Sequence, residues 1–170
     1  MQKNVSSLLI LDANVLIDFC VTDISLLSLI CNYVGQIYLP TPIVDEVTDV
    51  NEDRFVEWGI KIIEPELDQV ALAAGEDRSP LSFEDKICLI MAKQNGWTCV
   101  TNDKPLRQKC EEEGIPLIWG IELICILAES GGLPVNSAKE VISKIKTYNP
   151  KYITDSIVAK AFKRLEAKQK

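Results

Sequence analysis

Residues 8–17 decide the fold of this chain, and they read Leu8-Leu9-Ile10-Leu11-Asp12-Ala13-Asn14-Val15-Leu16-Ile17. The first four are all apolar, which is typical of a strand buried on both faces of a parallel sheet. Asp12 closes that run, and Val15, Leu16 and Phe19 then recur at helical spacing. A buried strand that passes through an aspartate into a helix predicts the first unit of an α/β fold.

The same alternation continues along the chain. Apolar runs predict further strands at residues 37–39, 60–63, 97–101 and 115–119. Periodic apolar residues predict helices at 24–33, 67–74, 83–94, 103–113, 121–129, 137–147 and 154–168. Another helix is expected to begin at Thr41-Pro42, with Thr41 as its N-cap, and residues 75–80 read as an exposed loop. This order predicts a parallel sheet flanked by helices.

The length and charge of the chain predict one α/β domain with a basic tail. Its 170 residues suffice for a single core, and Gly131-Gly132-Leu133-Pro134 is the candidate boundary. We therefore expect a catalytic domain over 1–133 and a C-terminal helical extension over 134–170. Residues 135–170 hold nine basic and three acidic side chains, whereas the whole chain carries a net charge of −7. The tail suits a local phosphate contact or an acidic partner, or simply forms solvated helix faces.

Composition removes several classes of function. The chain has no histidine, which excludes Ser-His-Asp and Cys-His catalysis and any histidine general base. Its six cysteines include no C-x-x-C pair, so we expect reduced thiols that fill core space rather than a zinc site. No apolar run is long enough to cross a membrane, and residues 1–7 lead into the first strand without a signal-peptide pattern. These features predict a cytoplasmic protein whose chemistry depends on carboxylates or a metal.

Four carboxylates fall at matching places in successive units. Asp12 and Asp103 follow strands, whereas Glu46 and Asp85 lie early in helices. Ligands of open α/β sheets bind beyond the carboxyl ends of the strands, where all four can meet. Gathered carboxylates repel one another unless a hard divalent cation such as Mg²⁺ or Mn²⁺ lies among them. Each acid taken alone also fits a structural role, because Asp12, Asp103 and the Ser82-x-x-Asp85 pattern are helix-capping signals.

These stretches resemble the four motifs of the PIN-domain family, and most closely its VapC-type toxins. The first motif is the strand that ends in Asp12-Ala13-Asn14, and the second is residues 37–47 with Glu46. The third is Leu81-Ser82-Phe83-Glu84-Asp85 with the helix that follows, and the fourth is Thr101-Asn102-Asp103. The resemblance spans about residues 8–130, and its specificity comes from the order of the four motifs rather than from any one of them.

The resemblance implies a Rossmann-like parallel sheet and a metal-dependent endoribonuclease, the toxin of a toxin–antitoxin pair. It implies Mg²⁺ or Mn²⁺ as cofactor, with Asp12, Glu46, Asp85 and Asp103 as catalytic metal ligands. Asn14, Thr101 and Asn102 would orient ligands or waters. The implied partners are an RNA substrate, a cognate antitoxin protein and a second copy of the chain.

Several alternatives stay open at this point. Asp45 and Glu84 each adjoin a proposed ligand, and successive helical residues point about 100° apart, so we favour Glu46 and Asp85. A haloacid-dehalogenase-like phosphatase needs a second aspartate where this chain has Asn14, and a receiver-type domain needs paired acids before Asp12. The strongest rival is a catalytically inactive PIN-like module that only binds protein or RNA.

Overall fold

A computed structural model describes residues 8–75 and 77–169 of the chain. The expectation for residues 1–7 lies outside this part, as does Glu76 within the loop predicted at 75–80. The strands are β1 (Leu9–Leu11), β2 (Ile37–Pro40), β3 (Lys61–Ile63), β4 (Thr98–Val100) and β5 (Leu117–Ile118). They form one parallel sheet in the order β3-β2-β1-β4-β5, which confirms the predicted fold class and every predicted strand.

Ten helices lie in the described residues, and all the predicted ones are present. They are α1 (Ala13–Thr22), α2 (Ser25–Tyr33), α3 (Thr41–Val44), α4 (Glu52–Glu57), α5 (Leu67–Ala74), α6 (Phe83–Asn95), α7 (Lys104–Glu112), α8 (Gly120–Glu129), α9 (Val135–Tyr148) and α10 (Asp155–Ala167). Helix α4 was not predicted from the sequence. Its signal is Asn51, whose side chain accepts from the backbone N–H of Asp53 at 3.0 Å and caps the helix.

Helix α3 differs from the prediction at both ends. Its N-cap is Pro40 rather than Thr41, and it ends at Val44 after a single turn. The backbone N–H groups of Glu46 and Val47 bond three residues back, to Ile43 and Val44, so the chain tightens and leaves the α-helix. Glu46, which we expected early in this helix, therefore lies in the turn after it.

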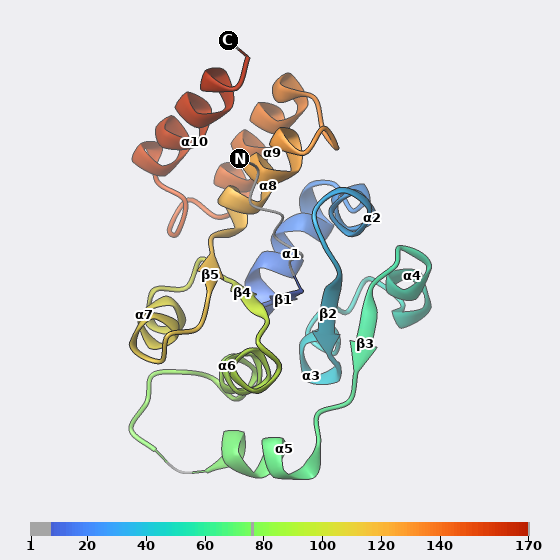
Figure 1. Cartoon of the computed structure of the whole chain (residues 1–170), viewed down its shortest axis with the longest axis vertical. Helices are drawn as coiled ribbons and strands as arrows, with labels where there is room; N and C mark the ends of the chain where they lie inside the picture. The colour runs from blue at the N-terminus through green and yellow to red at the C-terminus, as the bar shows by residue number, and fades with distance from the viewer. Residues whose placement is uncertain (1–7, 76, 170) are drawn as a thin grey trace.

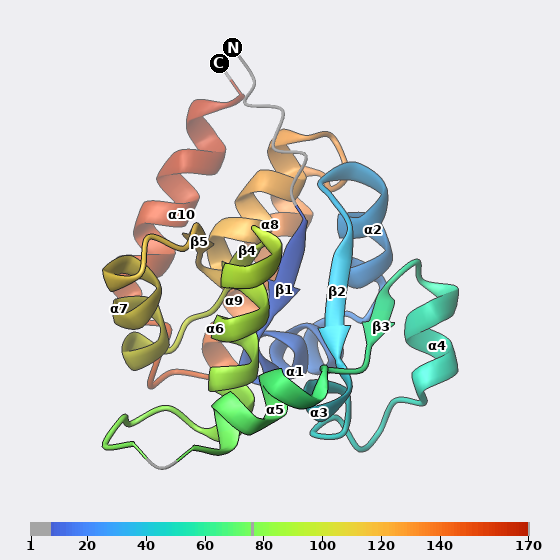
Figure 2. The ribbon, with the colours of Figure 1, turned by 60° about the horizontal axis from the view of Figure 1, so that its bottom comes forward.

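Helices cover both faces of the sheet. Figure 1 shows α5, α6 and α7 on one side, with α1, α2, α8 and α9 on the other and α10 outside them. Figure 2 shows β1 and β2 running side by side toward the edge where α1 and α3 begin. The chain adds β2 and β3 on one side of β1 and β4 and β5 on the other, so the strand order reverses between β1 and β4. Ligands of open α/β sheets bind at such a reversal.

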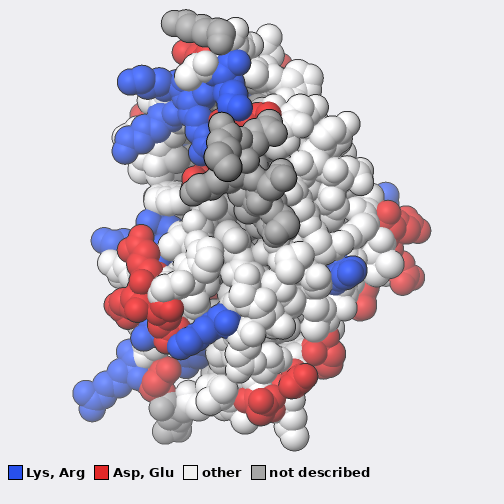
Figure 3. Space-filling view, in the orientation of Figure 1, with Lys and Arg blue, Asp and Glu red and all other residues white. Residues whose placement is uncertain are grey.

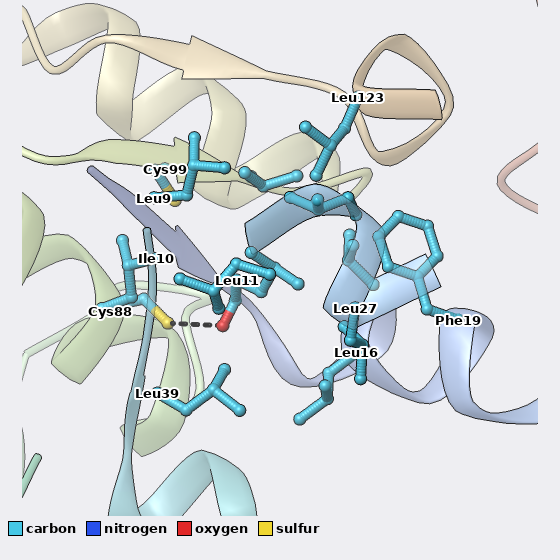
Figure 4. Packing of buried hydrophobic residues seen from close by; sticks show 14 of the residues in the cluster. Leu9, Ile10, Leu11, Leu16, Phe19, Leu27, Leu39, Cys88, Cys99 and Leu123 are labelled. Carbon is cyan, nitrogen blue, oxygen red and sulfur yellow. Dashed lines mark hydrogen bonds between the residues drawn. The ribbon is translucent and has the colours of Figure 1, made fainter. Parts of the chain in front are cut away.

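The core explains why β1 carries no polar residue. Leu9, Ile10 and Leu11 are all fully buried, with helices on both faces, and Leu16 and Phe19 of α1 belong to the same buried cluster (Figure 4). Cys88 of α6 donates its thiol to the Leu11 carbonyl at 3.7 Å. All six cysteines are free, and four of them are buried, as expected for thiols that fill core space.

The C-terminal helices share this core. Helix α9 packs against α1 and α8, and α10 packs against α8 and α9. Their buried members of the core cluster are Ala138, Val141, Ile142, Ile145, Ala161 and Leu165, together with Ile153 between the two helices. At the predicted boundary, a Cβ on Gly132 would lie 2.6 Å from Leu127 and 2.8 Å from Tyr33, so this turn packs closely against α8 and α2.

In the described residues, no single helix is both long and apolar enough to span a membrane. Helices α1 and α2 pass that test of length and composition only when taken together, as a pair bent by 114°.

Asp18 of α1 is buried where the end of α9 meets that helix. Asn149 donates its side-chain amide to the two carboxyl oxygens of Asp18 at 3.2 and 3.4 Å. Burial raises the pKa of Asp18 to about 6, and the hydrogen bond from Asn149 opposes this rise. The folded protein therefore favours the protonated form of Asp18 more than the unfolded chain does.

Asp18→Asn should stabilise the protein at pH 8 and leave its stability at pH 4 unchanged. The stability that a raised carboxyl pKa contributes is fully present below the unfolded pKa of 3.8, and it is lost as pH rises through about 6. Asparagine keeps an acceptor for Asn149 and never ionises. Urea unfolding in EDTA should show a gain on the order of 1–2 kcal/mol at pH 8. The exposed Asp49→Asn is the matched control, and an equal gain for Asp18→Asn at both pH values would contradict the explanation.

Candidate active site

The carboxylates gather at the reversal of strand order because β1 and β4 are neighbours in the sheet. Asp12 follows β1, and Thr101-Asn102-Asp103 follows β4. Asp85 lies in the first turn of α6, which packs against both strands. Asp12, Asp85 and Asp103 are close enough that the charges of Asp85 and Asp103 both act on Asp12. Three of the four predicted acids thus come together from separate elements.

Asp12 is the central carboxylate of the site and is only 1% exposed. Its Oδ1 accepts from the backbone N–H of Val15 at 2.9 Å, and its Oδ2 accepts from the Thr101 hydroxyl. Burial raises the pKa of Asp12 to about 7, against the hydrogen bonds from Thr101 and Val15 and with the help of Asp85 and Asp103. A buried carboxyl that half ionises near neutral pH favours a bound cation over a proton as pH rises.

The capping roles and the clustering are both present in the structure. Asp12 is the N-cap of α1, and Asp103 is the N-cap of α7, where its Oδ2 accepts from the Leu106 N–H at 3.1 Å. Asp85 closes a capping box with Ser82, whose N–H donates to Asp85 Oδ2 at 3.1 Å. Among the described residues, the Oδ1 atoms of Asp85 and Asp103 accept no hydrogen bond. One oxygen of each of these two acids holds a helix end, and the other remains for a ligand.

Glu46 reaches the site from its rim. It is exposed, and its pKa is raised. The largest cause is the burial of part of its side chain, and the next are the negative charges of Glu84 and Asp85. Glu84 is thus a fifth acid beside the four. It was not predicted as a metal ligand, because it adjoins Asp85 on one helix and Asp85 was favoured. The longer Glu84 side chain lies near Glu46, whereas Asp85 lies near Asp12 and Asp103. Asp45 is exposed at the end of α3.

The three supporting residues have different places. Thr101 is fully buried, and its hydroxyl donates to Asp12 and accepts from the Asp103 N–H at 3.0 Å. Asn102 is turned away from the acids, since its Oδ1 accepts from the Gly120 N–H at 2.9 Å and fixes the start of α8. Asn14 is exposed in the first turn of α1, beside Asp12.

The family of this chain follows from its match to a protein-family model. A family model described as a PIN domain matches residues 8–167, almost the whole of the chain. This chain belongs to the PIN-domain family. No curated protein and no solved structure matches it. The match includes the whole of α9 and α10, and it confirms the family to which the four motifs pointed.

PIN domains are generally nucleases and typically use divalent metal ions. The acids of this PIN domain offer the hard oxygen donors that Mg²⁺ and Mn²⁺ prefer. Within the described residues, no group of three or more acidic, cysteine or histidine side chains is arranged so that it could hold a metal ion. Mg²⁺ is commonly bound by one or two carboxylates together with waters and substrate phosphates, so this donor set fits that ion.

Proposed function

We propose that this PIN domain is a metal-dependent endoribonuclease. The observation that carries the proposal is the buried Asp12, which lies between Asp85 and Asp103 at the reversal of strand order and has a pKa near 7. Burial and the neighbouring carboxylates make ionisation of Asp12 costly, and a bound cation would stabilise its ionised form. Binding of a protein or RNA partner alone does not require a buried aspartate among other carboxylates.

Asp12, Asp85 and Asp103 would hold the cation, with Glu46 at the rim. When bound, a divalent ion would activate a water as the nucleophile and neutralise charge at phosphorus. Thr101 fixes the Asp12 carboxylate and the start of α7 in one hydrogen-bonded unit. Asn14 is exposed next to Asp12 and is available to orient the substrate.

The test is cleavage of labelled single-stranded RNA with Mg²⁺, with Mn²⁺ and with EDTA. Asp103→Asn should lose metal-dependent cleavage, because it removes a negative charge from the cluster while an asparagine still caps α7. Asp18→Asn is the matched control, since Asp18 is another buried aspartate and lies on α1 away from the cluster. Cleavage that survives EDTA or Asp103→Asn would refute the proposal. RNA binding without cleavage at any metal concentration would favour the inactive binding module.

Thr101→Val should weaken the apparent affinity for Mg²⁺ by about 10- to 100-fold, a usual effect of losing a residue that orients metal ligands. Valine has a similar shape but leaves Asp12 Oδ2 and the Asp103 N–H without their partner. Because the Thr101 hydrogen bond lowers the pKa of Asp12, its loss also strengthens competition from protons. Mg²⁺ titration of the cleavage rate measures the effect. Thr98→Val at the other end of β4 is the control, and an unchanged Mg²⁺ dependence in Thr101→Val would contradict it.

We further propose that the chain acts in the cytoplasm as the toxin of a toxin–antitoxin pair. This part of the proposal rests on the likeness of the four motifs to VapC-type toxins, which also suggests an antitoxin partner and a homodimer. The six free cysteines are compatible with a reducing compartment. Induced expression should arrest growth, and Asp103→Asn should remove the arrest. Growth that continues despite active nuclease in the extract would argue against the toxin role.

A further inference from the structure

A pocket lies between α8 and α10, at the residue that follows β5. Its volume is about 410 Å³, and its walls include Trp119, Cys125, Ile157, Lys160, Ala161 and Arg164. Trp119 is its aromatic wall, four lining residues are apolar, and three are charged, namely Glu122, Lys160 and Arg164. Pockets of this size with a few polar groups among apolar walls are typical of sites for small ligands or single groups of a larger one.

Hydrogen bonds join the backbone on either side of Trp119, a wall of the pocket, to the residues just before Asp103. Trp119 follows β5, and the Thr101 N–H donates to the carbonyl of Ile118, just before Trp119, at 3.1 Å. On the other side of Trp119, the Gly120 N–H donates to Asn102 at 2.9 Å. Trp119 is therefore held on both sides by the residues that lead into Asp103.

Arg107 covers one face of the Trp119 ring. Its guanidinium carbon lies 3.8 Å from the ring centroid, and it stands one helical turn after Asp103 on α7. No carboxylate of the described residues lies within ion-pair distance of Arg107, and its Nε is buried without a hydrogen-bond partner. Arg107 does not line the pocket, so the pocket borders the rest of the indole. An unpaired guanidinium beside an acidic cluster is suited to bind a phosphate.

The far wall of the pocket adds positive charge. Lys160 of α10 is exposed, and in the described part of the chain no acid pairs with it. Arg164 bonds Glu129 at 2.7 Å and approaches Glu122 at 3.5 Å, which fixes α10 against α8. Figure 3 shows Lys and Arg side chains gathered over α10, at the upper left. Acids therefore balance the charge of Arg164, and Lys160 is the unpaired cation of this pocket among the described residues.

We propose that the pocket between α8 and α10 receives one unpaired nucleotide of the RNA, with its base stacked on Trp119 and its backbone phosphates bound by Arg107 and Lys160. This inference deepens the proposed ribonuclease function and rests on it. Base stacking on an aromatic side chain tolerates any base and requires a base that is free of a duplex. The pocket therefore directs the nuclease to single-stranded RNA and fixes the distance from the bound base to the cleaved bond.

Binding of a labelled single-stranded RNA, measured by fluorescence anisotropy in EDTA, tests the pocket without cleavage. Trp119→Ala should weaken binding by about 5- to 100-fold, and Trp119→Phe should restore most of it. Arg107→Ala should weaken binding and reduce its dependence on salt. Arg54→Ala is the matched control, because Arg54 lies 5.5 Å from the ring of Trp58 on α4, away from this site. An RNA duplex of the same sequence should bind equally to wild type and Trp119→Ala.

Kinetics in Mg²⁺ separate this inference from the proposed activity. Trp119→Ala should raise KM in proportion to its loss of binding and change kcat by less than about threefold, as expected for uniform binding energy. Melting curves check that each variant is folded. If Trp119→Ala does not fold, Arg107→Ala still tests the pocket, because it is also expected to weaken RNA binding.

The outcomes are distinct. Cleavage with unchanged RNA affinity in both Trp119→Ala and Arg107→Ala would overturn the nucleotide pocket and retain the nuclease. RNA binding that depends on Trp119 without any cleavage would retain the pocket and refute the nuclease. No binding and no cleavage in wild type would overturn both.

Discussion

Asp12→Asn should abolish RNA cleavage and at the same time make the metal-free protein more stable at pH 8. Removing the central negative charge should lower the cleavage rate on the order of 10³-fold, because charge stabilisation by a bound metal supplies several kcal/mol. The stability contributed by a carboxyl with a raised pKa is present below 3.8 and lost as pH rises through about 7. At pH 8 the neutral asparagine should therefore gain on the order of 3–4 kcal/mol in EDTA.

Asp12→Ala is the control that separates charge from capping. Asparagine still accepts from the Val15 N–H, whereas alanine also removes the cap of α1, which costs about 1 kcal/mol. Both variants should be inactive, and Asp12→Asn should be the more stable of the two in urea. An active Asp12→Asn, or one less stable than wild type at pH 8, would refute the role given to Asp12.

Removing residues 134–170 should prevent folding. Helix α8 is buried almost all round, with Ile121, Leu123, Ile124 and Leu127 in the core, and α9 and α10 cover its outer side. A helix that is apolar on every side is stable only when every side is covered. The shortened chain would expose this surface and lose core side chains worth about 1.5–3 kcal/mol each, against a typical total stability of about 5–15 kcal/mol.

The measurement is urea unfolding followed by circular dichroism and by tryptophan fluorescence. The full chain should unfold cooperatively, whereas a chain ending at residue 133 should show no cooperative transition and should aggregate. A chain shortened only by residues 168–170 is the control, since Lys168 and Gln169 are exposed. Cooperative unfolding of residues 1–133 would show that the C-terminal helices are an independent addition.

The fold was predictable because local patterns and the observed elements agree. The apolar run at residues 8–11 and the signals Ser82 and Gly96 at the ends of α6 are strong, and the structure reproduces them. Helix α3 was misjudged because one turn of helix and a tight turn share the same apolar spacing. Helix α4 was missed because its capping signal, Asn51, precedes only one buried apolar side chain, Phe55.

The site was predictable in part. The positions of Asp12 and Asp103 follow from the ends of strands that pair in the sheet. The orientation of Asn102 toward Gly120 and the approach of Glu84 to Glu46 depend on segments distant in sequence. The same holds for the stacking of Arg107 on Trp119, which joins α7 to the end of β5. Such contacts leave no periodic pattern, so only the three-dimensional structure reveals them.

Asp12 and Asp103 each cap a helix and are also proposed metal ligands, and these two roles affect how the protein can evolve. Asn and Ser cap a helix about as well as Asp, but neither brings the negative charge that a cation needs. On the proposed function, replacement of Asp12 or Asp103 by Asn or Ser would therefore remove cleavage while α1 and α7 stay capped. A descendant can become a non-cutting RNA-binding protein through one such substitution. Among relatives, the residue at these two positions would then distinguish active nucleases from inactive ones.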